Sequence, residues 1–104
     1  DNHGLGQGFS PTDLVAAALG ACMITVMGIK ADTKGWSLEG VSCEVLKVME
    51  DAPRRVGRIA LLITMPSILD SHQRELLEMT AISCPVAKSL AAELEQVVQF
   101  KYEA

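Results

Sequence analysis

Sixteen consecutive residues, from Leu14 to Ile29, carry no charge. As a helix at about 1.5 Å per residue, this run would reach roughly 24 Å, whereas a membrane span usually needs about 20 apolar residues. Gly20, Thr25 and Gly28 weaken a membrane span further, and no basic flank or small-residue cleavage pattern marks a secretion signal. We therefore expect the buried helix of a soluble, cytoplasmic protein that has no membrane partner.

The residues around this run predict a helix from about Pro11 to Thr33. Ser10 is suited to the N-cap, Pro11 to the first helical position, and Gly35 to the stop. The middle of this helix is apolar on every face, so it must be enclosed on all sides. A single chain of 104 residues with a mean hydropathy of +0.26 has little interior for that purpose. We therefore expect part of this surface to meet another subunit.

The remaining periodicity predicts two strands joined by a polar hairpin, then two helices and a final strand. Alternating residues mark the strands, and a proline begins the second of these helices. The predicted order is α, β, β, α, α, β, which is an α+β fold with helices against one face of an antiparallel sheet. With no linker or repeat, residues 1–104 are expected to form one domain. The predicted ranges after the first helix are strands 41–49 and 56–65, helices 69–83 and 85–96, and a strand containing Val98, Phe100 and Tyr102.

Charge and composition argue against binding of nucleic acid and of metal ions. Nine Lys and Arg residues are outnumbered by thirteen Asp and Glu residues, and no basic stripe alternates with aromatic residues, so nucleic-acid binding is not expected. His3 and His72 are isolated and the chain has no CxxC motif, so we expect no metal site. No cofactor is expected either.

The three cysteines are Cys22, Cys43 and Cys84. Free cysteine usually packs as a small buried apolar residue. This packing role explains Cys43 in its strand, and it is also the simpler interpretation of Cys22 in the middle of the helix. Cys84 differs because it precedes Pro85 at a predicted helix N-terminus, where unpaired N–H groups favour the thiolate. We therefore predict that Cys84 has the most acidic thiol of the three.

The stretch from Ser10 to Cys22, SPTDLVAAALGAC, resembles the helix of the OsmC/Ohr superfamily, which reads Pro-x-x-Leu, an Ala-rich stretch and then Cys. Later motifs also look like landmarks of these proteins: KGW at 34–36, LEGV at 38–41 and CPV at 84–86. The resemblance covers nearly the whole chain in the same order. Members normally begin with roughly 30 to 40 residues of β-structure before this helix, and we expect those N-terminal strands to be absent from this chain.

The resemblance implies an intertwined homodimer in which two long central helices pack between sheets contributed by both chains. It also implies thiol-dependent reduction of organic hydroperoxides. In that chemistry Cys22 would be the peroxidatic thiolate and Cys84 the resolving thiol that forms a disulfide with it. A dithiol reductant of the lipoyl or thioredoxin type would then reopen the disulfide.

The sequence departs from the family at one position. In well-studied members, an N-terminal arginine assists the first cysteine and is held by a glutamate ten residues before it; here that position is Thr12. Asp13 would point about 100° away around the helix and is suited to capping. Arg54, Arg55 or Arg58 could supply a cation, although solvated hairpin charges are the simpler interpretation. The alternative function is therefore a non-enzymatic OsmC-like module that binds a small hydrophobic ligand at the dimer interface.

Overall fold

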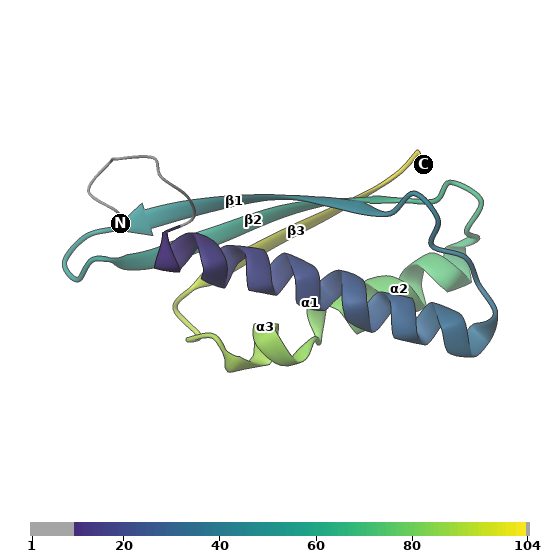
Figure 1. The fold of residues 1–104 in the computed structure, drawn as a ribbon, viewed down its shortest axis with the longest axis horizontal. Coiled ribbons are helices and arrows are strands. Elements are labelled where there is room, and N and C mark those ends of the chain that lie inside the picture. The colour runs from purple at the N-terminus through teal and green to yellow at the C-terminus, as the bar shows by residue number, and fades with distance from the viewer. Residues whose placement is uncertain (1–9, 104) are drawn as a thin grey trace.

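The computed structural model describes residues 10–103 as three helices on one face of a three-stranded sheet (Figure 1). The α+β class and the predicted order of elements are confirmed. In chain order, the elements are α1 (Pro11–Lys34), β1 (Ser42–Glu50), β2 (Arg55–Met65), α2 (Ser71–Ile82), α3 (Pro85–Ser89) and β3 (Glu95–Tyr102).

The sheet has the order β1-β2-β3 and is mixed in direction. β1 runs antiparallel to β2, with Val45 opposite Leu61, whereas β3 runs parallel to β2, with Val98 opposite Leu61. The prediction of an antiparallel sheet therefore holds for the hairpin and is wrong for β3. The reason is that the chain returns along α2 and α3 to the end where β2 began, and such a crossover produces parallel neighbours.

Local hydrogen bonds set the ends of α1. The Ser10 hydroxyl accepts a hydrogen bond from the Asp13 N–H at 3.1 Å, and the Asp13 carboxylate accepts one from the Ser10 N–H at 3.2 Å. This reciprocal capping box satisfies two of the N–H groups that a helix N-terminus leaves free. Gly35, with φ of 75°, ends the helix in the left-handed conformation that favours glycine.

One face of α1 and the inner face of β2 form the core. The buried residues of α1 recur at helical spacing, while those of β2 alternate. The Cys84 thiol belongs to the same cluster of buried side chains. The buried residues include Leu19, Met23 and Met27 of α1; Ile59, Leu61, Ile63 and Met65 of β2; and Leu77 and Ala81 of α2.

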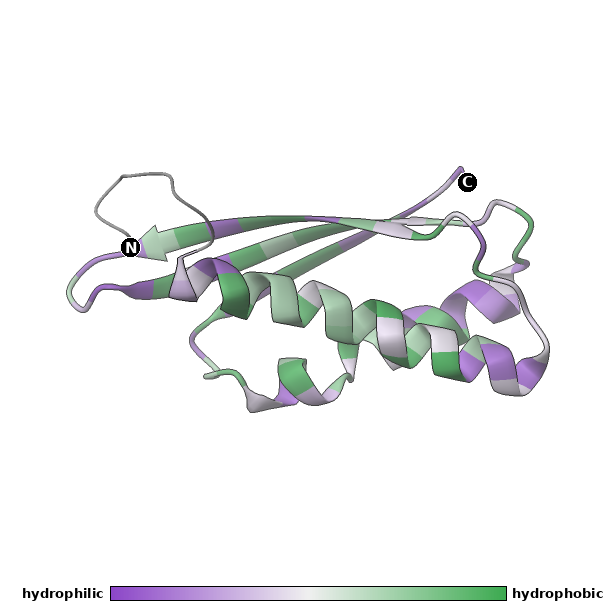
Figure 2. Cartoon of the chain, in the orientation of Figure 1, coloured by the Kyte–Doolittle hydropathy of each residue, from purple (hydrophilic) through white to green (hydrophobic). Residues whose placement is uncertain are grey.

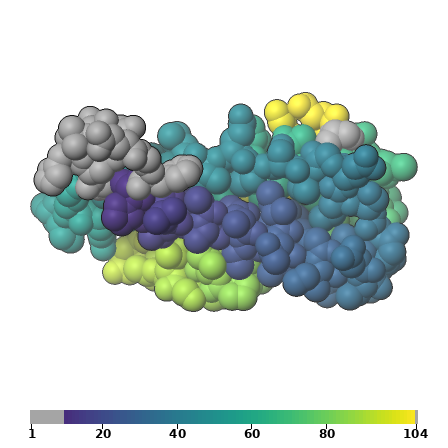
Figure 3. All heavy atoms as spheres, in the orientation of Figure 1, coloured from purple at the N-terminus to yellow at the C-terminus, as the bar shows by residue number. Residues whose placement is uncertain are grey.

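The opposite face of α1 is uncovered in the single chain. Leu14 is 57% exposed and Ile29 is 61% exposed, although both belong to the uncharged run. The ribbon coloured by hydropathy shows apolar residues along α1 (Figure 2), and the space-filling view shows this helix at the surface (Figure 3). By length and composition α1 could cross a membrane, a test that the core helices of soluble proteins also pass. The other described residues of this chain therefore cover α1 on one face and leave the opposite face exposed.

The predicted helix from Pro85 to Gln96 is wrong over its second half, because α3 ends at Ser89. The Ser89 hydroxyl donates to the Pro85 carbonyl at 2.8 Å, and Leu90 is extended, with φ of −82° and ψ of 152°. Gln96 pairs with Ile59 in the sheet, and its side chain donates to the Ala87 carbonyl at 3.1 Å. Strand pairing therefore overrides the helical spacing of the sequence in this segment.

Candidate functional site

Cys22 and Cys84 lie next to each other where α1 contacts α3. The Cys22 thiol is near enough to Cys84 to raise the pKa of the Cys84 thiol, and both cysteines are free of disulfides. Cys22 is half-buried in the middle of α1, while Cys84 is only 1% exposed. The structure thus brings together the two cysteines that the resemblance pairs, and their redox roles remain a prediction.

The turn between α2 and α3 holds Cys84 in place. Its N–H donates to the Ala81 carbonyl at 3.1 Å, and its carbonyl accepts from the Lys88 N–H at 3.1 Å. Its sulfur is the side-chain cap of α3 and accepts a hydrogen bond from the Ala87 N–H at 3.4 Å. With Pro85 as the first helical residue, the predicted N-cap position of Cys84 is confirmed.

The predicted acidity of Cys84 is wrong. Burial raises the pKa of the Cys84 thiol, and this effect outweighs the backbone N–H of Ala87, which acts to lower it. The neighbouring Cys22 thiol raises the pKa of Cys84 further. Removal from water disfavours a thiolate, and a short helix supplies too few N–H dipoles to compensate. Burial at the N-terminus of α3 therefore disfavours the thiolate of Cys84.

Cys43 lies apart from this pair, on the β1 side of α1. An ideal Cβ on Gly20 would be 3.3 Å from the Cys43 sulfur, so the thiol packs against the helix where it crosses the strand. Cys43 is half-buried, and burial is the main cause that raises its pKa. Its position agrees with the packing role expected from the sequence.

A lysine that the sequence analysis did not single out occupies the position next to Thr12. Lys47 Nζ donates to Thr12 Oγ1 at 2.8 Å and lies 2.9 Å from Asp13 Oδ1. The hydrogen bond from Lys47 is the main cause that lowers the pKa of Asp13 to about 2. Cys43, Val45 and Lys47 occupy alternate positions of β1, so their side chains point to the same face of the sheet. A charged residue on the face that packs against α1 was the sequence signal that could have identified Lys47.

The hairpin arginines are engaged with acidic partners on the sheet. Arg55 pairs with Glu50, and Arg58 Nε lies 3.2 Å from Glu95 Oε1. Arg54 is exposed in the turn. Their positions agree with the interpretation as solvated hairpin charges.

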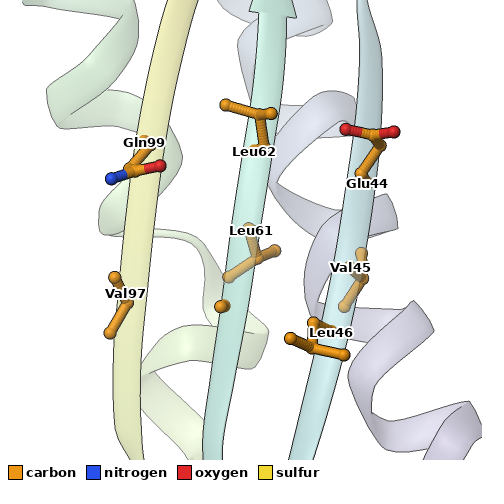
Figure 4. A pocket seen from close by; sticks show the side chains of 8 residues that line it. Glu44, Val45, Leu46, Leu61, Leu62, Val97 and Gln99 are labelled. Carbon is orange, nitrogen blue, oxygen red and sulfur yellow. The ribbon is translucent and has the colours of Figure 1, made fainter.

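The larger surface cavities lie away from the cysteine pair. One of about 250 Å³ opens on the sheet face opposite the helices, where Leu46, Leu62 and Val97 project (Figure 4). A second, of about 290 Å³, lies between α1 and β1 and is lined by Cys43 and Lys47. The third, of about 520 Å³, lies between α2 and β3. Neither Cys22 nor Cys84 lines any of them.

Within residues 10–103, no three His, Cys, Asp or Glu side chains come together as a metal site. His72 is exposed near the start of α2, and His3 lies outside the described residues. The chemistry available at the described site is therefore that of two adjacent thiols.

Comparison with known proteins gives matches over most of the chain. The family model described as OsmC-like protein matches residues 4–98. A Psychrobacter arcticus 273-4 protein, provisionally described as an osmotic stress induced and detoxification response protein, is 43% identical; the TM-score is 0.89 over 96% of this chain and 73% of that one. No curated protein matches the chain.

Two solved structures of lower identity share the fold. The organic hydroperoxide resistance protein OsmC of Legionella pneumophila is 22% identical, with a TM-score of 0.77 over 93% of this chain and 72% of that one. The organic hydroperoxide resistance protein OhrB of Bacillus subtilis is 20% identical, with a TM-score of 0.70 over 90% of this chain and 71% of that one.

Proposed function

Because this chain belongs to the OsmC-like protein family, we propose that it is a thiol-dependent peroxidase that reduces organic hydroperoxides with Cys22 and Cys84. The observation that carries the proposal is that these two thiols, which are far apart in sequence, lie near enough for the Cys22 thiol to raise the pKa of Cys84. Relatives of the same fold described as organic hydroperoxide resistance proteins support the substrate class.

The two thiols differ in the way that this chemistry needs. Cys22 is the more exposed, and as a thiolate it attacks the O–O bond, releases the alcohol and becomes a sulfenic acid. Cys84, buried and with a raised pKa, then attacks the Cys22 sulfur; a disulfide forms and water leaves. An external dithiol of the lipoyl or thioredoxin type reduces the disulfide by thiol exchange. The reaction belongs in the cytoplasm, where thiols are kept reduced.

A second copy of the chain is part of the proposal. The uncovered face of α1 carries exposed apolar residues, Leu14 and Ile29 among them, in a stretch without charge. Such a continuous apolar helix face is typical of an interface. Packing against the same helix of a partner would remove it from water, and Cys22 lies at its border.

Peroxide consumption in the presence of dihydrolipoamide tests the proposed activity. Cumene hydroperoxide should be consumed by the wild type and by Cys43→Ser, whose thiol packs elsewhere, whereas Cys22→Ser should be inactive. After one equivalent of peroxide, mass spectrometry under non-reducing conditions should find a disulfide between Cys22 and Cys84. Consumption by Cys22→Ser at the wild-type rate, or oxidation of Cys43 alone, would contradict the mechanism.

The second candidate is binding of a small hydrophobic ligand without turnover. It is favoured by Thr12, which here binds Lys47 at the position where the family resemblance implies a glutamate. Thermal-shift screening with lipids and aromatic compounds distinguishes the two functions. A large shift combined with no peroxide consumption would support the binding module.

A further inference from the structure

We propose that the sheet face away from the helices binds a small apolar molecule that carries a cationic group. The site is the cavity of about 250 Å³ on the outer face of the three strands, and it is separate from the proposed peroxidase centre because neither Cys22 nor Cys84 lines it. Apolar side chains hold the body of the ligand there, and the carboxylate of Glu44 binds its cation (Figure 4).

A small residue on the central strand creates the hollow. Ala60 of β2 lies opposite Leu46 of β1 and Val97 of β3, so a methyl group stands between two larger side chains. Leu62, two residues further along β2, points to the same face and borders the hollow along the strand. Leu46 is 64% exposed, so apolar surface around the hollow is in contact with water. The apolar body of a ligand would remove this surface from water.

Polar side chains border one end of the hollow. Glu44 of β1 and Gln99 of β3 lie opposite Leu62 on its two sides, and both line the cavity. The Glu44 carboxylate accepts hydrogen bonds, and the Gln99 amide both accepts and donates them. A group with several N–H donors, such as an ammonium, therefore suits this end of the hollow.

The pairing of charges on this face leaves Glu44 for a ligand. Two cations of the face already have acidic partners: Arg58 Nε lies 3.2 Å from Glu95 Oε1, and Lys101 Nζ lies 3.2 Å from Glu103 Oε1. Within residues 10–103, the Glu44 carboxylate forms neither an ion pair nor a hydrogen bond. A bound ammonium group would be attracted to this charge, whereas a carboxylate ligand would be repelled.

The size of the face favours a small ligand over a second copy of the chain. Strands lie about 4.8 Å apart, and side chains on one face recur roughly every 7 Å along a strand, so three strands with three rows of side chains cover roughly 300 Å². A stable interface buries about 800 Å² of each partner. The cavity also lies below the range of roughly 300–1,000 Å³ that is typical of sites for drug-sized ligands. A ligand of few non-hydrogen atoms therefore fits it best.

NMR titration of the isotope-labelled protein at neutral pH tests the site, with hexylammonium, hexanol and hexanoate as probes. Hexylammonium should shift amide signals of the three strands around the hollow and bind about fivefold more tightly than hexanol, and hexanoate should bind most weakly. Glu44→Gln should bind hexylammonium no more tightly than hexanol. Glu39→Gln removes the same charge from an exposed turn outside the cavity and should bind all three probes as the wild type does.

Ala60→Leu fills the hollow and should weaken the binding of hexylammonium and hexanol about tenfold, and its own spectrum shows whether the variant is folded. The proposal would be overturned by an absence of shifts with hexylammonium, or by shifts confined to the helices. It would also be overturned by hexanoate binding as tightly as hexylammonium, or by equal hexylammonium affinities of the wild type and Glu44→Gln.

Discussion

Gly20 lies where α1 crosses β1, at a point with no room for a side chain. An ideal Cβ there would be 2.9 Å from Val45 Cγ2 and 3.3 Å from the Cys43 sulfur. Valine is stiff at its branched carbon, so the strand itself would have to move. Gly28, in the same helix, has no atom within 4 Å of an ideal Cβ. The two glycines therefore provide a matched comparison.

Gly28→Ala should raise the free energy of unfolding by about 1 kcal/mol, the usual gain when alanine replaces a helical glycine. Gly20→Ala should lower it by about 1 kcal/mol, because overpacking outweighs that gain. Urea unfolding at one protein concentration measures both values. Equal gains for the two variants would show that the crossing has free space.

The pair of Lys47 and Asp13 predicts a dependence of stability on acid. The pKa of Asp13 is lowered to about 2 in the folded protein, with Lys47 as the main cause, against about 3.9 in an unfolded chain. A depressed pKa means that the contribution is complete above about pH 4 and is lost as the pH falls towards about 2. In Lys47→Met, the Tm should therefore fall less steeply than in the wild type over this range.

Lys101→Met is the matched control for Lys47→Met, because it removes a lysine that lies 3.2 Å from Glu103 in an exposed pair. It should leave the acid limb of the wild-type Tm profile unchanged. Parallel profiles for the wild type and Lys47→Met would mean that Lys47 does not stabilise the ionised Asp13.

Among the elements, α2 and β3 are tied together by the side chain of Tyr102. Its hydroxyl donates to the Glu78 carboxylate, and the Arg74 guanidinium lies 4.0 Å from the centre of its ring. Arg74 Nε also donates to the Leu69 carbonyl at 2.7 Å, which connects the same cluster to the loop before α2. Burial first, and then Glu78, raise the pKa of Tyr102 well above its usual range.

The chain has one tyrosine, so its absorbance in alkali reports Tyr102 directly. Because the folded pKa is raised, this contribution to stability is complete below about pH 10 and is lost as the pH rises further. Tyrosinate absorbance in the wild type should therefore appear only together with unfolding, followed by circular dichroism. In Glu78→Gln it should appear at lower pH. Reversible ionisation of Tyr102 near pH 10 in the folded wild type would contradict this account.

The prediction of helices and strands was correct where it depended on residues close together in sequence. The two long helices follow the N-caps Ser10 and Asp70, whose side chains accept hydrogen bonds from N–H groups three residues later, and such caps are visible in sequence. It failed after Ser89, where Ala91 and Leu94 have helical spacing and yet precede a strand that pairs with β2. That pairing depends on a partner more than thirty residues away in sequence, which periodicity cannot show.

For the whole molecule, we expect the uncovered face of α1 to determine how many chains assemble. We expect a dimer in sedimentation, because a charge-free helix face with residues such as Leu14 and Ile29 exposed is unfavourable in water. Ala18→Glu places a carboxylate on this face and should give a monomer. Ala92→Glu, at an exposed position after α3, should remain a dimer. A monomeric wild type, or a dimeric Ala18→Glu, would show that α1 is not the interface.

The amino-acid sequence by itself determined the α+β class and the start and end of α1, and its motifs carried the family resemblance that implies the pairing of Cys22 with Cys84. These follow from caps, hydropathy and motifs, which act within short stretches of chain. Only the tertiary structure decided the parallel direction of β3, the early end of α3, the contact of Lys47 with Thr12, and the raised pKa of the Cys84 thiol. Burial and contacts between distant residues govern all four, and the solvation of a thiol in particular depends on what the rest of the fold places around it.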